Sequence, residues 1–205
     1  MNSQDLLKAK FQPPPVRAGF LPRPRLSARF RKNLKRKLTL LAAPAGSGKT
    51  TLVSSLIPDL DMPVSWLSLD RDDNDPTRFL AYFTAALQKI QPDFDLQQSS
   101  TPANLATAQI EAVGVPLINQ LANFPEQWIL IVDNYQCIQH PAVHKLISHL
   151  ITHLPIQAHL VLLTRADPPF PLSRLRAAGE LLEIRASDLM FTPEEVREFL
   201  NLNTG

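Results

Sequence analysis

Five short apolar runs alternate with helical patterns between residues 38 and 190, and this alternation constrains the fold more than any other feature of the sequence. The runs are rich in leucine, isoleucine and valine and occupy residues 38–42, 64–69, 128–132, 159–164 and 181–184. Strands that alternate with helices form parallel sheets with helices on both faces. The sequence therefore predicts an α/β fold, a three-layer sandwich around a five-stranded parallel sheet.

Helical patterns fill the intervals at residues 49–56, 75–90, 103–122, 141–154 and 171–178. Asp75 followed by Pro76 is a typical helix start, because aspartate caps the first turn and proline fits its first position. Thr192 and Glu195 have the spacing of a capping box around Pro193, which predicts one more helix. We expect residues 191–205 to be the truncated start of a following helical or winged-helix domain.

The first apolar run continues into a loop that leads into a helix, with the sequence Ala43-Pro44-Ala45-Gly46-Ser47-Gly48-Lys49-Thr50-Thr51. Two of the six glycines of the chain lie in this loop, where they let backbone N–H groups turn toward a phosphate at the positive end of the helix dipole. In such a loop Lys49 reaches the β- and γ-phosphates and Thr50 binds Mg²⁺. The pattern normally begins with glycine, and Ala43 takes that place here. We predict that residues 43–51 bind ATP or ADP with magnesium.

The third apolar run ends in a carboxylate, Asp133, which Asn134 follows. A strand buried on both faces has little reason to end in aspartate unless the charge is used, and in proteins with such a loop this aspartate holds Mg²⁺. The alternative is an aspartate that caps the next turn. Many ATPases carry a second acid directly afterwards to polarise the attacking water, where this chain has Asn134. The sequence thus predicts slow hydrolysis, or a base that comes from elsewhere.

The fourth apolar run ends in Thr164 and Arg165. In an open parallel sheet, ligands bind beyond the carboxyl ends of the strands. Arg165 should therefore lie at the same edge as Lys49 and Asp133, where it is a candidate sensor of the γ-phosphate. The alternative is a surface arginine at the end of a strand.

The first 37 residues are strongly basic, with eleven Lys and Arg against a single acid, Asp5. Because the whole chain has a net charge of +2, the remainder carries −8. A basic arm on an acidic body is suited either to polyanions such as nucleic acid, or to a nucleotide and the acids of the body itself. The arm holds few aromatic residues and no recognition-helix pattern, so we expect no DNA contact by this part of the protein.

Other residues that attract attention have simpler explanations. His140, His144, His149 and His153 lack the intervening glutamate of a metalloprotease helix, so we interpret them as lying on solvated helix faces. The acids within residues 70–75 are expected to cap helices and to contact the basic arm rather than bind a cation. Cys137 is the single cysteine, which excludes an intramolecular disulfide, and we expect it to be structural.

The order of these elements resembles the N-terminal ATPase domain of the LuxR-type, MalT-like (maltose-activator-like) transcription regulators, a branch of the STAND signal-transduction ATPases. The likeness covers about residues 7–201. Besides the loop and the two strand ends, the segments that carry it are Phe20-Leu21-Pro22-Arg23-Pro24-Arg25-Leu26, Trp66-Leu67-Ser68-Leu69-Asp70 and Leu189-Met190-Phe191-Thr192.

The resemblance implies a P-loop NTPase of the ASCE and STAND type, with its core at residues 38–190. Residues 1–37 would be an arm and helix that contribute to the nucleotide site, with Leu21 and Arg23 lining the adenine and ribose. Family members usually have aspartate in place of Asn134. The resemblance also implies partner domains, namely a winged helix, helical repeats and a DNA-binding helix-turn-helix, and ATP-dependent self-association.

Taken together, these features predict the ATP- or ADP-binding switch domain of an ATP-dependent transcription regulator, with weak Mg²⁺-dependent ATPase activity. The alternatives are a P-loop kinase or motor ATPase with fast turnover, and an interaction module that binds nucleotide structurally. The apolar runs are far shorter than the roughly 20 residues that a membrane helix needs. We therefore expect no membrane contact and a cytoplasmic location.

Overall fold

A computed structural model of the chain describes residues 6–16, 19–96 and 110–204. The first seven residues of the helix predicted at 103–122 lie outside this range, as do parts of the basic arm and Gly205. Among the described residues, none of the helices combines the length and the apolar character that a membrane span requires.

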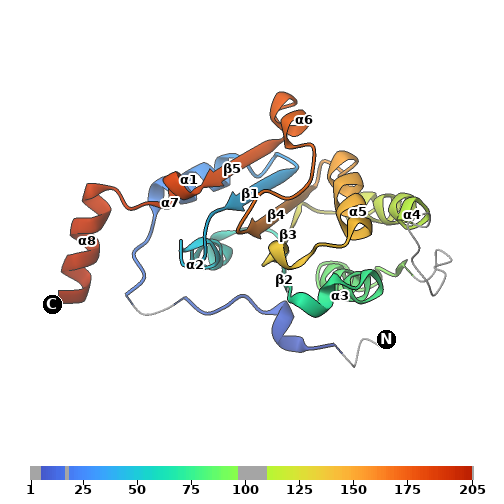
Figure 1. The fold of residues 1–205 in the computed structure, drawn as a ribbon, viewed down its shortest axis with the longest axis horizontal. Coiled ribbons are helices and arrows are strands. Elements are labelled where there is room, and N and C mark those ends of the chain that lie inside the picture. The colour runs from blue at the N-terminus through green and yellow to red at the C-terminus, as the bar shows by residue number, and fades with distance from the viewer. Residues whose placement is uncertain (1–5, 17–18, 97–109, 205) are drawn as a thin grey trace.

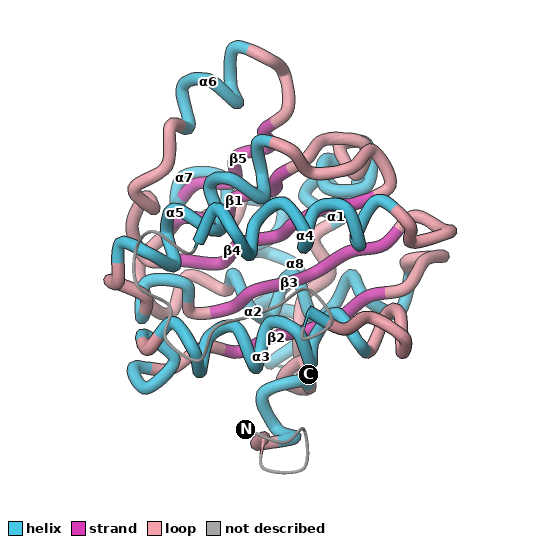
Figure 2. Tube along the Cα trace, turned by 90° about the vertical axis from the view of Figure 1, so that its right-hand side faces the viewer, coloured by secondary structure: helices cyan, strands magenta, loops and turns pink. Residues whose placement is uncertain are grey.

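A five-stranded, fully parallel sheet forms the centre of the protein (Figure 1). Its strands are β1 (Leu38–Ala42), β2 (Val64–Ser68), β3 (Trp128–Asp133), β4 (Ala158–Thr164) and β5 (Leu181–Arg185). Their order across the sheet is β2-β3-β4-β1-β5, which Figure 2 shows from bottom to top. The predicted fold class is confirmed, and each strand lies within one or two residues of its predicted range. Because β4 separates β1 from β3, the end of β4 lies between the phosphate-binding loop and Asp133.

Eight α-helices are described around this sheet. They are α1 (Pro24–Lys32), α2 (Lys49–Leu56), α3 (Pro76–Gln88), α4 (Ile110–Ala122), α5 (Pro141–Thr152), α6 (Leu172–Ala177), α7 (Ala186–Leu189) and α8 (Pro193–Thr204). Four 3₁₀ turns join them at η2 (Lys8–Phe11), η3 (Ile57–Asp59), η4 (Arg71–Asn74) and η7 (Tyr135–Cys137).

Alternate side chains of the strands point into two separate hydrophobic cores, one on each face of the sheet. One core joins the sheet to α3, α4, α5 and α6, and the other joins it to α1, α2 and α7. Figure 1 shows the first group to the right of the sheet and the second to its left. Burial of both faces explains why the strands read as continuous apolar runs rather than as alternating patterns.

The predicted helix starts are present. Asp75 Oδ1 accepts a hydrogen bond from the backbone N–H of Arg78 at 2.8 Å, and Pro76 occupies the first turn of α3. Thr192 and Glu195 form the reciprocal bonds of a capping box, at 3.3 and 2.8 Å. Figure 1 shows α8 projecting from the body, and the side chains of its residues Val196 and Leu200 are exposed.

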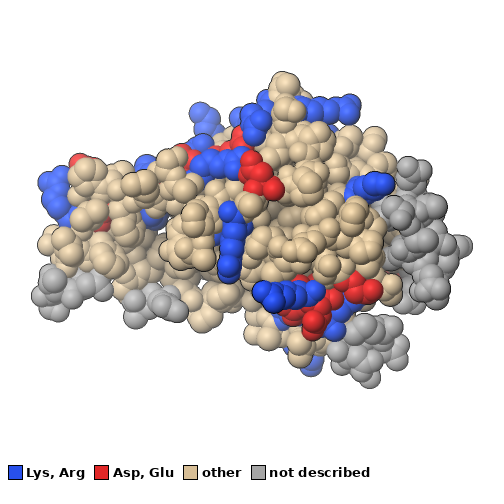
Figure 3. Space-filling view, viewed as in Figure 1, with Lys and Arg blue, Asp and Glu red and all other residues tan. Residues whose placement is uncertain are grey.

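The basic arm lies against acids of the body. Lys10 is buried, and its ammonium contacts Asp73 Oδ2 at 2.5 Å and Asp70 Oδ2 at 2.7 Å. Arg29 pairs in the same way with Asp188, at 2.6 Å. Figure 3 shows basic and acidic side chains gathered side by side on this face of the molecule. The sequence left open whether the basic arm binds a polyanion such as nucleic acid or the acids of the body itself. Contact with the acids of the body accounts for Lys10 and Arg29.

The histidines differ from expectation, because most of them are half-buried rather than solvated. His144 shares a hydrogen bond of 2.9 Å with the Tyr135 hydroxyl, and His140 caps α5. His149 packs so closely on α4 that a Cβ added to Gly114 would lie 2.7 Å from its ring. Hydrogen bonds and packing therefore explain His140, His144 and His149. The described residues hold no group of three or more acidic, histidine or cysteine side chains arranged for a metal.

Candidate nucleotide site

The loop after β1 has the backbone of a phosphate-binding loop. Gly46 and Gly48 have φ angles of 77° and 82°, which side-chain-bearing residues adopt at a cost. A Cβ added at either glycine would meet no atom within 4 Å, so conformation rather than space requires glycine here. The Ser47 hydroxyl closes the loop by donating to the Pro44 carbonyl at 2.8 Å. Gly48 is the N-cap residue of α2 and provides no side-chain hydrogen bond to its first turn, whose backbone N–H groups point toward the loop side of the helix.

Lys49 is buried at the first position of α2. Its ammonium donates to the carbonyl oxygens of Ala43 at 2.6 Å and Pro44 at 2.8 Å. Burial lowers the pKa of Lys49, the nearby Asp133 carboxylate opposes this shift, and Arg165 adds to it. Charged phosphate oxygens are stronger acceptors than neutral carbonyls, so this ammonium is suited to a phosphate beside the loop.

Thr50 and Asp133 meet between α2 and the end of β3. The Thr50 hydroxyl donates to Asp133 Oδ2 at 3.0 Å, while the backbone N–H of Asn134 donates to Oδ1 at 2.8 Å. Burial raises the pKa of Asp133, and these two hydrogen bonds and Lys49 partly offset the rise. A hydroxyl beside a carboxylate is a hard oxygen donor pair of the kind that Mg²⁺ uses together with phosphates and water. The two residues therefore fit the magnesium role predicted for them.

Arg165 lies where the strand order places it, directly after β4. Its side chain is exposed, and it forms no hydrogen bond or ion pair within the described part of the chain. Its charge is near enough to lower the pKa of Lys49. A cation at this edge is thus available to a phosphate group held by the loop.

A cavity of about 400 Å³ opens beside the loop and joins segments from three parts of the chain. One wall comes from the loop and α2, a second from residues 19–23, and a third from residues 186–199. The predicted residues on its surface are Leu21, Arg23, Gly46, Ser47, Gly48 and Thr51. The structure therefore brings the arm and the loop together, as the resemblance implies.

The third wall was not predicted from the sequence. It contributes Leu189, Met190, Phe191 and Phe199, which give the cavity an apolar side. An apolar wall of this kind suits the flat, apolar faces of a nucleobase. In the sequence, the signal for this wall was the pair of aromatic residues, Phe191 and Phe199, in the segment predicted to start a new helix.

Arg23 lines the cavity, but its hydrogen-bonding atoms are turned toward this third wall. Its Nε donates to Glu195 Oε1 at 2.8 Å, and the two Nη atoms donate to the carbonyls of Leu189 at 3.2 Å and Met190 at 2.9 Å. The guanidinium carbon also lies 4.6 Å from the centre of the Phe191 ring. Arg23 therefore fastens the arm to the start of α8.

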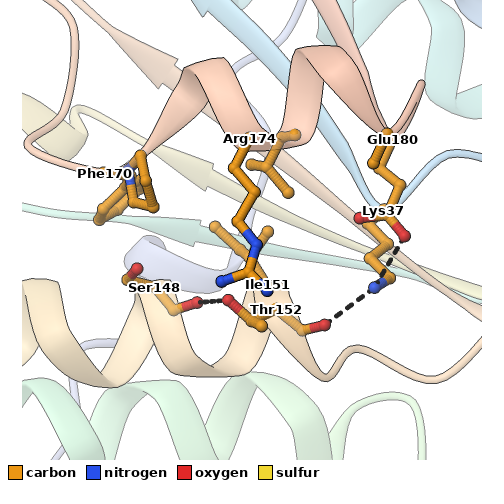
Figure 4. A pocket seen from close by; sticks show the side chains of 10 residues that line it. Lys37, Ser148, Ile151, Thr152, Phe170, Arg174 and Glu180 are labelled. Carbon is orange, nitrogen blue, oxygen red and sulfur yellow. Dashed lines mark hydrogen bonds and ion pairs between the residues drawn. The ribbon is translucent and has the colours of Figure 1, made fainter.

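A second hollow, of about 270 Å³, lies between α5 and α6 and contains none of the predicted site residues. Figure 4 shows Arg174 reaching from α6 toward α5, while Lys37 bridges the Thr152 carbonyl and the Glu180 carboxylate. The Lys37 charge is thus already neutralised. Lys49, Thr50, Asp133 and Arg165 line neither hollow, whereas the glycines of the loop, Leu21 and Arg23 line the cavity beside the loop.

Cys137 follows Asp133 closely but lacks the features of a nucleophile. Its side chain is half-buried, and burial and the charge of Asp70 raise the pKa of the thiol. A thiol with a raised pKa is protonated at neutral pH and unreactive. This agrees with the structural role expected for it.

A family model described as an AAA domain matches residues 27–163 of the chain. The regulator MalT of Serratia proteamaculans is 31% identical over 196 residues, which are 96% of this chain and 22% of the relative. MalT of Cronobacter sakazakii is 32% identical over 179 residues, covering 87% of this chain and 20% of the relative. The chain thus spans about a fifth of the length of these curated relatives.

Solved structures share the fold at lower identity. A STAND protein with a tetratricopeptide repeat sensor from Pyrococcus horikoshii superposes with a TM-score of 0.55 at 13% identity, over 96% of this chain and 27% of that one. Cdc6p of Pyrobaculum aerophilum also reaches 0.55, at 16% identity over 96% and 53% of the two chains. The predicted resemblance to the ATPase domain of MalT-like regulators is confirmed, and because the family model covers more than half of the chain, the chain belongs to the AAA domain family.

Proposed function

We propose that this protein is the nucleotide-operated switch of an ATP-dependent transcription regulator, and that it binds ATP or ADP with magnesium and hydrolyses ATP slowly. The observation that carries the proposal is the cavity in which the phosphate-binding loop, the arm and the start of α8 meet. A ligand in that cavity touches three segments that are far apart in the sequence. Its identity can therefore change how those segments fit together.

Each predicted residue has a role in this proposal. Lys49 and the N-terminus of α2 hold the β- and γ-phosphates, and Arg165 responds to the γ-phosphate. Leu21 and Arg23 line the site of the base and ribose. Thr50 and Asp133 hold Mg²⁺, which when bound neutralises phosphate charge.

Slow hydrolysis follows from the residue after Asp133. An amide orients water by hydrogen bonding but takes no proton from it at neutral pH. A switch needs binding that depends on the state of the nucleotide more than it needs fast chemistry. Rapid turnover by the purified protein would favour a motor or kinase instead.

The proposal extends to the domains of the regulator. Residues 1–37 serve the nucleotide site, residues 38–190 form the ATPase core, and residues 191–205 lead into a winged-helix domain. Helical repeats and a DNA-binding helix-turn-helix would follow, as the large relatives suggest, with ATP-dependent self-association in the cytoplasm. Contact with DNA would belong to those domains rather than to this one.

Replacement of Lys49 by alanine tests the nucleotide site. A charge-assisted hydrogen bond contributes about 1.5 to 3 kcal/mol, so the affinity for ATP with magnesium should fall at least about tenfold. Calorimetric titration measures the affinity, and Lys145→Ala, at an exposed position of α5, is the matched control. Equal affinities in the Lys49→Ala variant and the unaltered protein would refute the site.

A further inference from the structure

Part of the basic arm has no acidic partner in the described body of the protein. Lys32, Lys35 and Arg36 lie at the end of α1 and in the loop that leads to β1. None of the three forms an ion pair with a described acid, and their one side-chain hydrogen bond joins Arg36 to the carbonyl of Leu181 at 2.6 Å. Three cations thus lie together here without a counter-charge.

These cations line a hollow of about 570 Å³ at the amino edge of the sheet. The hollow opens where β4, β1 and β5 begin, whereas the phosphate-binding loop follows the other end of β1. Four basic side chains and one carboxylate line it. Because Lys37 pairs with that carboxylate, Glu180, at 2.9 Å, the remaining charge is +3. A nucleotide in the loop would neither cover nor neutralise this surface.

The basic hollow also has an apolar side, which Leu154, Pro155 and Ile156 form. The Ile156 side chain is 91% exposed, so it is available to a partner that approaches the cations. Burying such a side chain against apolar atoms is favourable, whereas a purely ionic ligand gains nothing from it. The hollow is therefore suited to a ligand that is both anionic and apolar.

The hollow between α5 and α6 continues this surface, since Lys37 and Glu180 line both hollows. Arg174 reaches over it from α6, and its side chain forms no hydrogen bond or ion pair within the described ranges (Figure 4). Two buried apolar residues, Ile151 and Leu175, line it as well. We call the two hollows together the amino-edge groove, and both parts of it combine cations with apolar side chains.

We propose that the amino-edge groove binds a protein segment in which acidic residues alternate with apolar ones. The carboxylates of such a segment pair with Lys32, Lys35 and Arg36, and opposite charges of this kind favour and orient an encounter. Its apolar side chains pack on Ile156 and on the apolar lining between α5 and α6. Because the groove lies at the opposite edge from the phosphate-binding loop, this binding goes beyond the proposed function and does not depend on it.

Nucleic acid is the other polyanion that a basic surface can bind. Sites for single strands stack the bases on aromatic rings, and the described residues that line the larger hollow include no aromatic side chain. The affinity of duplex DNA grows with the number of phosphates that are neutralised, and the few cations of the groove neutralise few of them. Neither form of nucleic acid would use the apolar side. The observations therefore favour a protein segment.

Fluorescence anisotropy with two short labelled peptides tests the proposal. The probe is a peptide of alternating glutamate and leucine, and the control peptide has glutamine in place of every glutamate. The probe should bind at least about tenfold more tightly than the control, and added salt should weaken its binding because exposed charges are screened. Equal affinities for the two peptides, or binding of neither, would overturn the proposal.

Charge reversal in the groove locates the binding. Lys32 and Lys35 are exposed, so the double variant Lys32→Glu, Lys35→Glu should fold normally. Each exposed ion pair contributes up to about fivefold in affinity, so this variant should bind the probe about tenfold more weakly. Lys8→Glu with Lys89→Glu makes the same change of charge at exposed positions outside both hollows, and the affinity should stay within about twofold. An equal loss in both double variants would show an effect of net charge alone and would contradict the assignment.

Two further variants distinguish the groove from a nucleic-acid site and from the nucleotide site. Ile156→Ser should weaken the probe at least about threefold and leave the binding of a labelled DNA duplex unchanged. Unchanged probe affinity in this variant, or a duplex that binds the unaltered protein more tightly than the probe does, would overturn the proposal. Lys49→Ala should bind the probe as tightly as the unaltered protein, whether or not the proposed function holds. Loss of the probe in Lys49→Ala would place it at the phosphate-binding loop and refute the groove.

Discussion

Acidification should destabilise the protein through His159, a histidine buried in the centre of the sheet. This residue of β4 is 2% exposed. Its Nδ1 lies 2.5 Å from the Arg36 carbonyl, which can only accept, so Nδ1 carries the proton. Its Nε2 therefore accepts from the Thr39 hydroxyl at 2.9 Å. Burial disfavours the charged ring and lowers the pKa of His159 to about 4.

The size and sign of the effect follow from this pKa. An exposed histidine has a pKa of about 6.5, so on acidification the unfolded chain binds a proton at this position before the folded protein does. Proton binding therefore favours the unfolded state. The stability due to neutral His159 is complete above pH 6.5 and is lost as the pH falls toward 4. Each pH unit in that window costs about 1.4 kcal/mol, which gives a total of about 3 kcal/mol. Below pH 4 the folded protein binds the proton as well, and the loss levels off.

Urea unfolding at several pH values between 7 and 4.5 measures this contribution. Carboxylates titrate in the same range, so the comparison is with His159→Gln, which lacks the ionisable ring. Between pH 7 and 5 the unaltered protein should lose about 2 kcal/mol more than the variant does. His153→Gln, at an exposed position, should follow the unaltered protein. Parallel losses in His159→Gln and the unaltered protein would refute the argument.

Three other substitutions test separate parts of the proposed switch. Arg165→Ala should weaken ATP binding more than ADP binding in calorimetric titrations, and a uniform loss would contradict its role as a sensor. Asn134→Asp should raise the single-turnover rate, with about 10² to 10⁴ as the upper limit for a general base. Adding Asp133→Ala should abolish that gain, and no gain at all would show that position 134 does not face the attacking water. Glu195→Gln removes the charge partner of Arg23, so amide hydrogen exchange should quicken in α8 while the sheet is unaffected.

The sequence predicted the sheet well because the responsible signals are local. The strands β1, β3 and β4 are buried along their whole length, so the apolar run of each coincides with the strand. The starts of α3 and α8 were also predictable, because a cap and its partner lie within three residues of each other. The phosphate-binding loop was predictable for the same reason, since its glycines and Lys49 lie within four residues of one another in the sequence.

Pairing between residues far apart in the chain could not be predicted from such local signals. Arg23 and Glu195 are 172 positions apart, and no local pattern around either residue indicates its partner. The helix α1 buries Leu26 and Phe30, but the strongly basic residues around them concealed this pattern. The exposure of His149 was misjudged for the same reason, because its ring packs closely on α4.

The cavity also limits how a switch of this kind can operate. Arg23 fastens the arm to the start of α8, and both border the same cavity as the loop. On the proposed function, a nucleotide that contacts all three must bind with different affinity when α8 is docked and when it is released. Linkage makes the effect reciprocal, so a tenfold difference in affinity shifts the docking equilibrium by about 1.4 kcal/mol. A nucleotide bound equally well in both arrangements would shift nothing, however tightly Lys49 held it. The contacts that matter for signalling are therefore those of the third wall, and the phosphate contacts matter only so far as they differ between ATP and ADP.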